Sequence, residues 1–555
     1  MSVNTLISRI ERAAEGEGTL TVASPEGYDT TTWAQTHDQA RSLAAALATR
    51  GAGPGAHVAI LGPTTRPLIT AIQATWLTGS TLVMLPLPMR LGSIDAFVEA
   101  TRSRIRAADC GLVLIDEQFS PFVERIEGDP PFVVLQELCD EATRLSADRW
   151  QRPPDDPDAL AVLQFTSGST AEPKGVMLTH RAICANLDGC TQAGGLIPDE
   201  VFVSWLPLYH DMGLVGLLTI PMTTSTSLVQ AAPQDFLARP ARWMQWVSDR
   251  RGTMTAGPNF AYALAARALR RATDLDLSSL QIMLNGAEPI DPTTFRRFLD
   301  AAAPFGLRPE VAFPAFGMAE VCIGGTFPKR WQGFRTDVVD AAALEHEHVA
   351  RPVDSASEPD TPTRELSLLG TAVPGLELRV VEPGTYDAKD DRQVGELLIR
   401  GTSVTPGYYK NPEATAELLA EGWLHTGDLA YLLDGELVIC GRIKDVIIVG
   451  GRNIYPQDIE RSASTVPGVR PGNVIAFGVE GRAGAQHIVV VAELGDGEAD
   501  SVRNDLTEAV IRDIGVPPWE VVLVQKGTVP KTSSGKLQRS LARTRWESGE
   551  LESVG

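Results

Sequence analysis

Residues 163 to 180 read LQFTSGSTAEPKGVMLTH, a stretch in which an apolar segment leads into a loop of small polar residues. The apolar segment predicts a strand over 159–165, and Thr179 is a predicted N-cap for a helix that begins at His180. Glycines and hydroxyl residues in the loop leave backbone N–H groups accessible, and Lys174 adds a cation. This combination favours a polyphosphate ligand, with a Gly/Ser surface loop as the alternative.

The loop differs from the Walker A pattern, GxxxxGK[ST], because Lys174 is followed by Gly175 and an apolar residue. It follows a predicted strand, and strand ends are where α/β proteins usually bind ligands. Apolar runs at 57–61 (HVAIL) and 111–115 (GLVLI), with a helix-period segment at 93–108, continue the alternation of strands and helices. We therefore predict an α/β fold with a buried parallel sheet and crossover helices.

Chain length and charge exclude several classes of protein. With 555 residues the chain exceeds the ~250 to 300 at which one core stops growing, so at least two domains are expected. A formal net charge of −21 argues against a general binder of nucleic acid or of anionic membranes. The start of the chain lacks the apolar region of a signal peptide, and the apolar stretch 213–222 is shorter than the ~20 residues that span a bilayer. We expect a cytoplasmic protein that binds no nucleic acid and is not an integral membrane protein.

The cysteines form no CxxC pair and no metal-ligand group with histidine, so we expect free thiols, as in a reducing cytosol. They are Cys110, Cys139, Cys184, Cys190, Cys322 and Cys440. Nearer the C-terminus, predicted strands at 473–477, 487–492 and 521–524 accompany an amphipathic helix at 501–514. This pattern is typical of a small α+β domain.

Several further windows contain residues suited to nucleotide chemistry. An aromatic ring such as Phe316 can cover a base, a carboxylate such as Glu320 can bind Mg²⁺, and one such as Asp428 can accept hydrogen bonds from both ribose hydroxyls. Taken singly, each is also a common core or turn residue. The windows are SWLPLYHDMG (204–213), AGPNFAY (256–262), LNGAEPI (284–290), AFGMAE (315–320), HTGD (425–428), GRIKD (441–445), GRNIYPQDIE (451–460) and VPKTSSGKLQR (529–539).

In this order, the windows resemble the adenylate-forming superfamily, and most closely its fatty acyl-AMP ligase branch. The opening loop, HTGD and SSGK are marks of the superfamily, whereas SWLPLYHDMG, PNFAY, NGAEP and GRNIYPQDIE point to the branch. The resemblance covers nearly the whole chain, from 57 to 539. It implies a large α/β N-terminal domain of several subdomains with wound sheets (1–440), a hinge (441–445) and a small mobile α+β C-terminal domain (446–555).

The resemblance also implies the residues that bind the nucleotide, Mg²⁺ and the acid. The ATP site would comprise Thr166, Ser167, Gly168, Ser169, Thr170, Lys174, Gly286, Ala287, Glu288, Phe316, Gly317, Met318, Asp428, Arg442 and Lys536. Thr166 and Glu320 would hold Mg²⁺, Asp445 would be the hinge, and His210, Asp211 and Asn259 would border the acyl substrate. Lys536, Glu320 and His210 would be the catalytic residues.

The activity implied is that of an ATP-dependent ligase. A fatty carboxylate attacks the α-phosphorus of MgATP and expels pyrophosphate, and the acyl adenylate then reacts with a thiol. In the branch resembled, that thiol is usually the phosphopantetheine arm of an acyl carrier protein, or of the carrier domain of a polyketide or nonribosomal peptide synthase. The alternatives are a fatty acyl-CoA synthetase, and a non-catalytic acyl- or nucleotide-binding module that has no reason to keep Lys536.

The sequence evidence on the thiol acceptor is divided. Gly450 and Ile454 stand where many acyl-AMP ligases carry Tyr and His, and the Gly450-Gly451 pair leans towards the acyl-CoA ligases. The tract from Thr336 to Gly370 resembles the extra element of the branch that uses CoA poorly, although it could equally be a solvated loop. The other branch-specific windows favour a carrier protein.

Phe316 stands where the family more commonly carries Tyr. This replacement removes a hydroxyl but keeps the aromatic face that can stack on the base.

Carrier proteins are usually acidic, so docking on this acidic chain requires a local basic surface. The candidates lie beside the loop of Lys536, with a solvated helix face as the alternative. They are Lys531, Arg539, Arg543 and Arg545.

Overall fold

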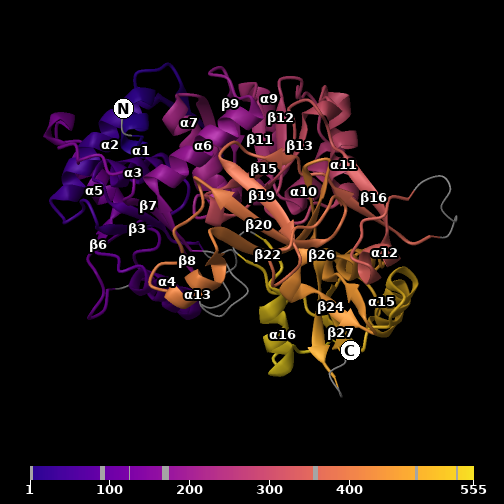
Figure 1. Ribbon diagram of the computed structural model, residues 1–555. Helices are drawn as coiled ribbons and strands as arrows, with labels where there is room; N and C mark the ends of the chain where they lie inside the picture. The colour runs from indigo at the N-terminus through magenta and orange to yellow at the C-terminus, as the bar shows by residue number, and fades with distance from the viewer. Residues whose placement is uncertain are drawn as a thin grey trace.

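The structure is a computed structural model that describes residues 4–87, 94–123, 125–165, 174–353, 361–481, 486–532 and 535–554. Its first sheet has the order β6-β5-β3-β4-β7-β8 and is parallel except for the β7–β8 pair (Figure 1). Its strands are β3 (His57–Leu61), β4 (Thr81–Met84), β5 (Leu112–Ile115), β6 (Phe132–Val134), β7 (Leu160–Phe165) and β8 (Gly175–Thr179). The helices among them are α2 (Trp33–Ala48), α3 (Arg66–Leu77), α4 (Ile94–Ala107) and α5 (Leu135–Ala142).

This sheet confirms the predicted strands at 57–61, 111–115 and 159–165 and, within the described residues, the helix at 93–108. The predicted cap is also confirmed, because the Thr179 hydroxyl accepts the Ala182 N–H at 3.1 Å at the start of α6 (His180–Gly194). Strand β8 was not predicted. The loop at 166–173 lies outside the described residues, but its two ends belong to antiparallel neighbours, β7 and β8.

A second sheet has the order β13-β12-β11-β9-β10-β1-β2 and is parallel except for β1–β2. It comprises β1 (Thr19–Ser24), β2 (Gly27–Thr32), β9 (Val201–Ser204), β10 (Ser227–Ala231), β11 (Met254–Gly257), β12 (Ile282–Asn285) and β13 (Ala312–Pro314). The helices of this part are α1 (Leu6–Ala13), the π-helix η2 (Met212–Thr219), α7 (Ile220–Thr224), α8 (Pro233–Ala238), α9 (Ala241–Arg250), α10 (Asn259–Leu269) and α11 (Pro292–Ala302).

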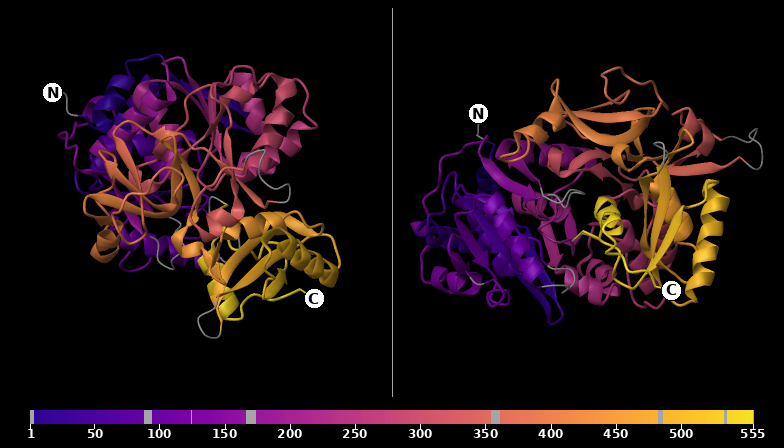
Figure 2. Two further views of the ribbon diagram at one scale, coloured as in Figure 1. Left: turned by 45° about the vertical axis from the view of Figure 1, so that its right-hand side comes forward. Right: turned by 90° about the horizontal axis from the view of Figure 1, so that it is seen from below.

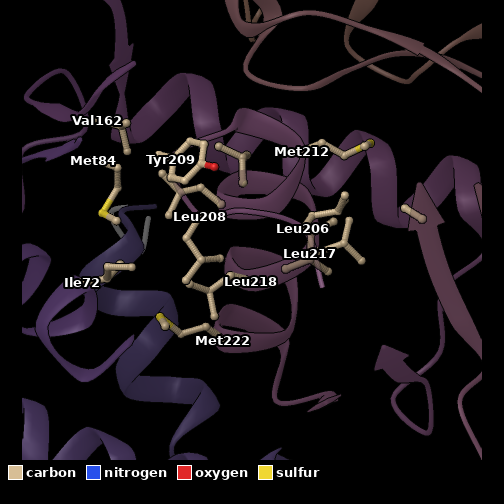
Figure 3. Packing of buried hydrophobic residues seen from close by; sticks show 14 of the residues in the cluster. Ile72, Met84, Val162, Leu206, Leu208, Tyr209, Met212, Leu217, Leu218 and Met222 are labelled. Atoms are coloured by element: carbon tan, nitrogen blue, oxygen red, sulfur yellow. The ribbon is translucent and has the colours of Figure 1, made fainter. Parts of the chain in front are cut away.

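One hydrophobic core joins the two sheets. Figure 3 shows η2 and the segment before it packing against the first sheet, with Tyr209 near Met84 and Val162, and Leu218 near Ile72. All of these side chains are buried. Because burying a side chain of this size contributes ~1.5 to 3 kcal/mol, this core fixes the segment that carries His210 against strand β7.

An antiparallel sheet follows, with the order β19-β20-β22-β21 and with β23 paired to β22. Its strands are β19 (Leu376–Val381), β20 (Gly395–Gly401), β21 (Leu419–Ala420), β22 (Trp423–Leu433) and β23 (Glu436–Arg442), next to α13 (Pro412–Leu418). A small sheet of β14 (Phe316–Gly317), β15 (Gly324–Phe327) and β18 (Thr371–Ala372) lies before it in the chain. Short 3₁₀ turns are η1 (Ala147–Arg149), η3 (Ala303–Phe305), η4 (Pro309–Val311), η5 (Ala319–Val321) and η6 (Ile443–Asp445).

The C-terminal residues form an α+β unit with hydrophobic clusters of their own. They comprise β24 (Ile447–Val449), β25 (Arg452–Ile454), α14 (Pro456–Ala463), β26 (Val469–Glu480), β27 (Gln486–Leu494), α15 (Ala499–Ile514), β28 (Glu520–Val524) and α16 (Arg539–Glu547). The predicted strands and the helix of this part are confirmed. Figures 1 and 2 show the unit, in orange to yellow, at one end of the molecule beside the antiparallel strands. The exact domain boundaries stay a prediction.

The tract 336–370 is folded where the structure describes it. Strands β16 (Thr336–Asp340) and β17 (Thr363–Ser367) pair with each other, and α12 (Ala341–His346) follows β16. Ion pairs tie this tract to the C-terminal unit, from Glu345 to Arg452 at 2.7 Å and from Arg364 to Asp458 at 2.9 Å. In its described part the tract is therefore an anchored element and not a solvated loop; residues 354–360 lie outside the described ones.

All six cysteines are free, as expected. Within the described ranges, the helices include none with the length and apolar composition needed to cross a membrane.

Candidate active site

The predicted site residues that the structure describes line one large cleft between the N-terminal sheets and the C-terminal unit. Five of the predicted residues lie outside the described ones: Thr166, Ser167, Gly168, Ser169 and Thr170. The cleft is lined by Lys174, His210, Asp211, Asn259, Gly286, Ala287, Glu288, Phe316, Gly317, Met318, Glu320, Asp428, Arg442, Asp445 and Lys536.

Tyr408 contacts a cation and a carboxylate where the opening loop leads into strand β8. The Lys174 ammonium lies 5.0 Å from the ring centre of Tyr408, and the Tyr408 hydroxyl donates to Glu320 Oε1 at 2.8 Å. Glu320 is buried on the turn η5. Burial raises the pKa of the Glu320 carboxyl, and the hydrogen bond from Tyr408 opposes this effect.

The described residues contain no cluster of three His, Cys, Asp or Glu side chains that could enclose a metal ion. A lone carboxylate such as Glu320 suits Mg²⁺, which keeps several waters and is usually held by one or two carboxylates together with substrate phosphates. The described donors therefore fit a magnesium ion that arrives with the nucleotide.

His210 and Asp211 form a pair at the start of η2. Their side chains lie 2.6 Å apart, from His210 Nδ1 to Asp211 Oδ1, and the Met212 N–H donates to Asp211 at 2.8 Å. Burial by itself would raise the pKa of Asp211, but His210, Lys536 and the Met212 N–H lower it to about 2. Asp211 is thus an anion that orients His210 towards the cleft.

The loop after strand β12 meets the N-terminus of α10. Asn259 donates from Nδ2 to the Pro289 carbonyl at 2.5 Å and accepts the Asp291 N–H at 3.2 Å, so it fixes this loop in place. Glu288 accepts backbone N–H groups of α10. Burial raises the pKa of Glu288, and nearby Lys536 opposes the rise.

Strands β12 and β13 pair with each other and end side by side at the cleft. A Cβ atom on Gly286 would lie only 2.9 Å from the Ala315 carbonyl oxygen, so a side chain here would push the two segments apart. Ala287 has a φ of +71°, a conformation that costs a non-glycine residue about 1 kcal/mol. Phe316 and Met318 line the cleft next to this turn, which gives the site an apolar face.

Asp428 and Arg442 face each other across strands β22 and β23. Arg442 Nε donates to Asp428 Oδ1 at 2.9 Å, and the Asp428 side chain is only 6% exposed. Burial raises the pKa of Asp428, whereas Arg442 opposes it. Lys444 is a cation that the sequence interpretation missed; burial and Arg442 lower its pKa, and Lys174 lies near enough to add to that effect.

The loop of Lys536 reaches over the cleft from the C-terminal unit. A Cβ atom on Gly535 would lie 3.1 Å from the Phe260 ring, so this loop packs directly on α10. Lys536 also lines a smaller, mainly apolar pocket with His210, Phe260 and Ala287. The lysine thus stands between the charged part of the cleft and its apolar part.

The apolar part of the cleft extends along strands β11 and β12. It runs from Gly286, past the carboxyl end of β12, to Ile282 at its amino end, roughly 13 Å at ~3.3 Å per residue. Its other walls come from η2, α6 and the residue before β15, through Met212, Gly216, Leu217, Cys190 and Ile323. Such a pocket has the composition and depth to receive an aliphatic chain.

The prediction of a basic docking surface for a carrier protein is wrong for Arg539. Arg539 is only 17% exposed, and its guanidinium binds Glu460 Oε2 at 2.6 Å and Asp445 Oδ2 at 3.1 Å. It therefore links the predicted hinge residue to α14 and is not available to a partner. Arg543 lies on the surface and pairs with Glu547 at 2.8 Å.

Comparisons with known proteins agree on one family. The model of the AMP-binding enzyme family matches residues 10–409. A medium-chain-fatty-acid–[acyl-carrier-protein] ligase, JamA of Moorena producens, is 37% identical over 434 residues, covering 75% of this chain and 72% of that protein. A long-chain-fatty-acid–AMP ligase, FadD26 of Mycobacterium marinum, is 34% identical and covers 94% of this chain and 93% of its own.

A solved structure from a study of fatty acyl-adenylate ligases from E. coli and L. pneumophila superimposes with a TM-score of 0.91 at 29% identity. It covers 99% of both chains. The similarity thus extends over both the N-terminal sheets and the C-terminal unit.

The Arg539 cluster generates a stability prediction. Arg539→Ala leaves Glu460 buried without its cation, so the free energy of unfolding should fall by ~3 to 5 kcal/mol. The control is Arg543→Ala on the same helix, whose exposed pair should change it by less than ~1 kcal/mol. Urea unfolding of both variants provides the comparison, and equal midpoints would contradict the assigned role of Arg539.

Proposed function

The chain belongs to the AMP-binding enzyme family, within its fatty acyl-AMP ligase branch, and on that premise we propose that it joins a fatty acid to AMP and passes the acyl group to a carrier protein. In the first step ATP and the acid give acyl-AMP and pyrophosphate. In the second, the phosphopantetheine thiol of an acyl carrier protein, or of the carrier domain of a polyketide or nonribosomal peptide synthase, takes the acyl group.

The observation that carries this proposal is the meeting of a charged cleft and an apolar pocket at Lys536. On one side lie the charged groups of Lys174, Glu320, Asp428 and Arg442, and on the other lies the pocket along β11 and β12. A fatty acid bound in that pocket would present its carboxylate to the charged side. Nucleotide and acid would then meet at the lysine.

We assign the nucleotide to the charged side. Thr166 to Thr170 and Lys174 would bind the phosphates, and the turn of Gly286, Ala287 and Glu288 would cradle the adenine with Phe316, Gly317 and Met318. Asp428 would accept the ribose hydroxyls, with Arg442 holding its carboxylate in place. Mg²⁺, held by Glu320 and Thr166, would supply charge neutralisation to the phosphates.

The chain's residues would promote the first step by position and charge, without a protein nucleophile. A carboxylate oxygen attacks the α-phosphorus, and the bond from that phosphorus to the bridging oxygen breaks as pyrophosphate leaves. Two anions must approach each other, so cations placed in advance are worth most in the transition state. Lys536 reaches the meeting point, while His210, oriented by Asp211, would border the carboxylate.

The second step needs the thiol to attack the acyl carbon, with AMP as the leaving group. The proposed domains are 1–440 and 446–555, and rotation at the hinge 441–445 around Asp445 would withdraw Lys536 and admit the thiol. The contacts of the 336–370 tract with the C-terminal unit, such as Glu345 to Arg452, would limit that rotation and favour an acceptor that binds the protein surface. A cytoplasmic location belongs to this proposal, because ATP and carrier thiols are available there.

The acceptor experiment tests the function as a whole. The enzyme is given MgATP, a mixture of fatty acids, and either CoA or a holo-carrier protein, and the products are identified by mass spectrometry. We expect acyl-AMP to accumulate with CoA and acyl thioester to form on the carrier. Rapid, stoichiometric acyl-CoA formation at micromolar CoA would establish the acyl-CoA synthetase instead, and the absence of acyl-AMP with every acid would overturn the ligase.

Lys536 provides a test of the adenylation step. Lys536→Ala should lower the rate of pyrophosphate release by about 10² to 10³-fold at saturating ATP and acid, the scale for losing one preorganised donor. ATP affinity should change little, because the charge acts mainly in the transition state. Turnover equal to that of the wild type would exclude the assigned role.

Asp428 provides a test of the ribose site. The wild type should discriminate against 2′- and 3′-deoxy-ATP, because a missing hydroxyl leaves a buried carboxylate unpaired. Asp428→Ala should raise the KM for ATP and reduce that discrimination. Steady-state kinetics with the three nucleotides measures both, and a wild type that accepts all three equally would place the ribose elsewhere.

A further inference from the structure

Tyr408 lines the charged part of the cleft and contacts both Lys174 and Glu320, although no sequence window singled it out. It belongs to a connecting segment, residues 403–409, that runs between strand β20 and helix α13. The residue is only 9% exposed, and it forms part of the wall of the cleft.

The connecting segment is attached to the strand that follows the opening loop. The Tyr409 N–H donates to the Gly175 carbonyl at 2.8 Å, and the Met177 N–H donates to the Gly407 carbonyl at 3.1 Å. Tyr408 and Val176 form the antiparallel bridge between these two bonds. The segment therefore pairs with β8 through one bridge and two hydrogen bonds, directly after Lys174.

The same segment is attached to the turn that carries Glu320. The Thr405 N–H donates to the Glu320 carbonyl at 2.8 Å, and the Thr405 hydroxyl donates to the Met177 carbonyl at 2.6 Å. Two parts of the chain that are separated by more than 140 residues in sequence, β8 and η5, are thus held to one backbone segment.

The Tyr408 side chain also links these two parts of the chain, because it contacts a charged group next to each of them. Its ring lies 5.0 Å from the Lys174 ammonium, within the range of a cation–π contact, and its hydroxyl donates to Glu320 Oε1 at 2.8 Å. The aromatic face attracts the cation, while the hydroxyl attracts the anion. One side chain thereby contacts both charges.

We propose that Tyr408 is a positioning residue that holds Lys174 and Glu320 in place to receive the phosphates and Mg²⁺ of MgATP. This inference rests on the proposed function. Its ring would fix the position of the Lys174 ammonium, and its hydroxyl would fix the position of the Glu320 carboxylate. Preorganised charges need not be rearranged when the nucleotide binds, which favours binding.

The two parts of the side chain are tested separately. Tyr408→Phe removes the hydroxyl and keeps the ring, so it should weaken the binding that depends on Mg²⁺. Tyr408→Leu also removes the ring, so it should weaken ATP binding in EDTA as well. The control is Tyr409→Phe, because the neighbouring Tyr409 hydroxyl donates to Asp109 at 2.8 Å and not to a group of the cleft.

The measurement is calorimetric binding of ATP to the full chain without fatty acid, once with Mg²⁺ and once with EDTA. For Tyr408→Phe we expect MgATP affinity to fall by ~10-fold or more, as for the loss of a hydrogen bond to a charged group, and affinity in EDTA to stay within about 2-fold of the wild type. For Tyr408→Leu we expect a further loss of ~2 to 5-fold in EDTA. Tyr409→Phe should match the wild type in both.

Thermal unfolding shows whether each variant is folded. If Tyr408→Leu is not folded, the result for Tyr408→Phe decides the test alone. MgATP affinity of Tyr408→Phe equal to that of the wild type would overturn the inference while leaving the proposed function intact. An equal loss with and without Mg²⁺ would also overturn it, because the hydroxyl would then act only on the general structure of the cleft. A wild type that binds no MgATP would overturn the proposed function together with this inference.

Discussion

The pairing of buried carboxylates with cations is the constraint on which the rest of the structure depends. Asp428, Glu460 and Asp211 are all largely removed from water, and each faces a cation or an imidazole within 3 Å. An isolated charge in such surroundings would cost several kcal/mol, so every segment that carries one partner must be held to the segment that carries the other. Asp428 and Arg442 join strands β22 and β23, and Arg539 joins Glu460 on α14 to Asp445 in the predicted hinge, so these pairs fix parts of the cleft wall.

The hydrophobic core supplies the rigidity that this arrangement requires. The side chains of η2 fill the space between the two parallel sheets, which places His210 on one side of the cleft and the apolar pocket behind it. The C-terminal unit has its own buried clusters and contacts the rest through ion pairs, through the loop of Lys536 and through Tyr455, which packs in a small hydrophobic cluster with residues of the 336–370 tract and of β22 and β23. It contributes Lys536 without sharing the central core. A rigid N-terminal cleft, combined with a separately folded C-terminal unit that supplies Lys536, suits a reaction that has two steps at one site.

Local features were predictable from the sequence, and distant partnerships were not. Thr179 caps its helix through a residue three positions away, and the apolar runs at 57–61 and 111–115 specify strands by composition alone. Strand β8 was missed because its short run gains its neighbours from β7 and from residues 407–409, far along the chain. Arg539 was misread as a surface cation because Glu460, its partner, lies 79 residues away. Tyr408 was missed for the same reason, since Glu320 is 88 residues from it.

The central claim is that a fatty carboxylate attacks the α-phosphorus of ATP in this cleft. A fatty acid with ¹⁸O in both carboxylate oxygens, supplied with MgATP and a holo-carrier protein, tests it directly through the mass of the nucleotide product. The account predicts AMP that carries one ¹⁸O atom and pyrophosphate that carries none, because the attacking oxygen stays on phosphorus when the thiol displaces AMP. Formation of ADP, label in pyrophosphate, or unlabelled AMP accompanying thioester formation would contradict it.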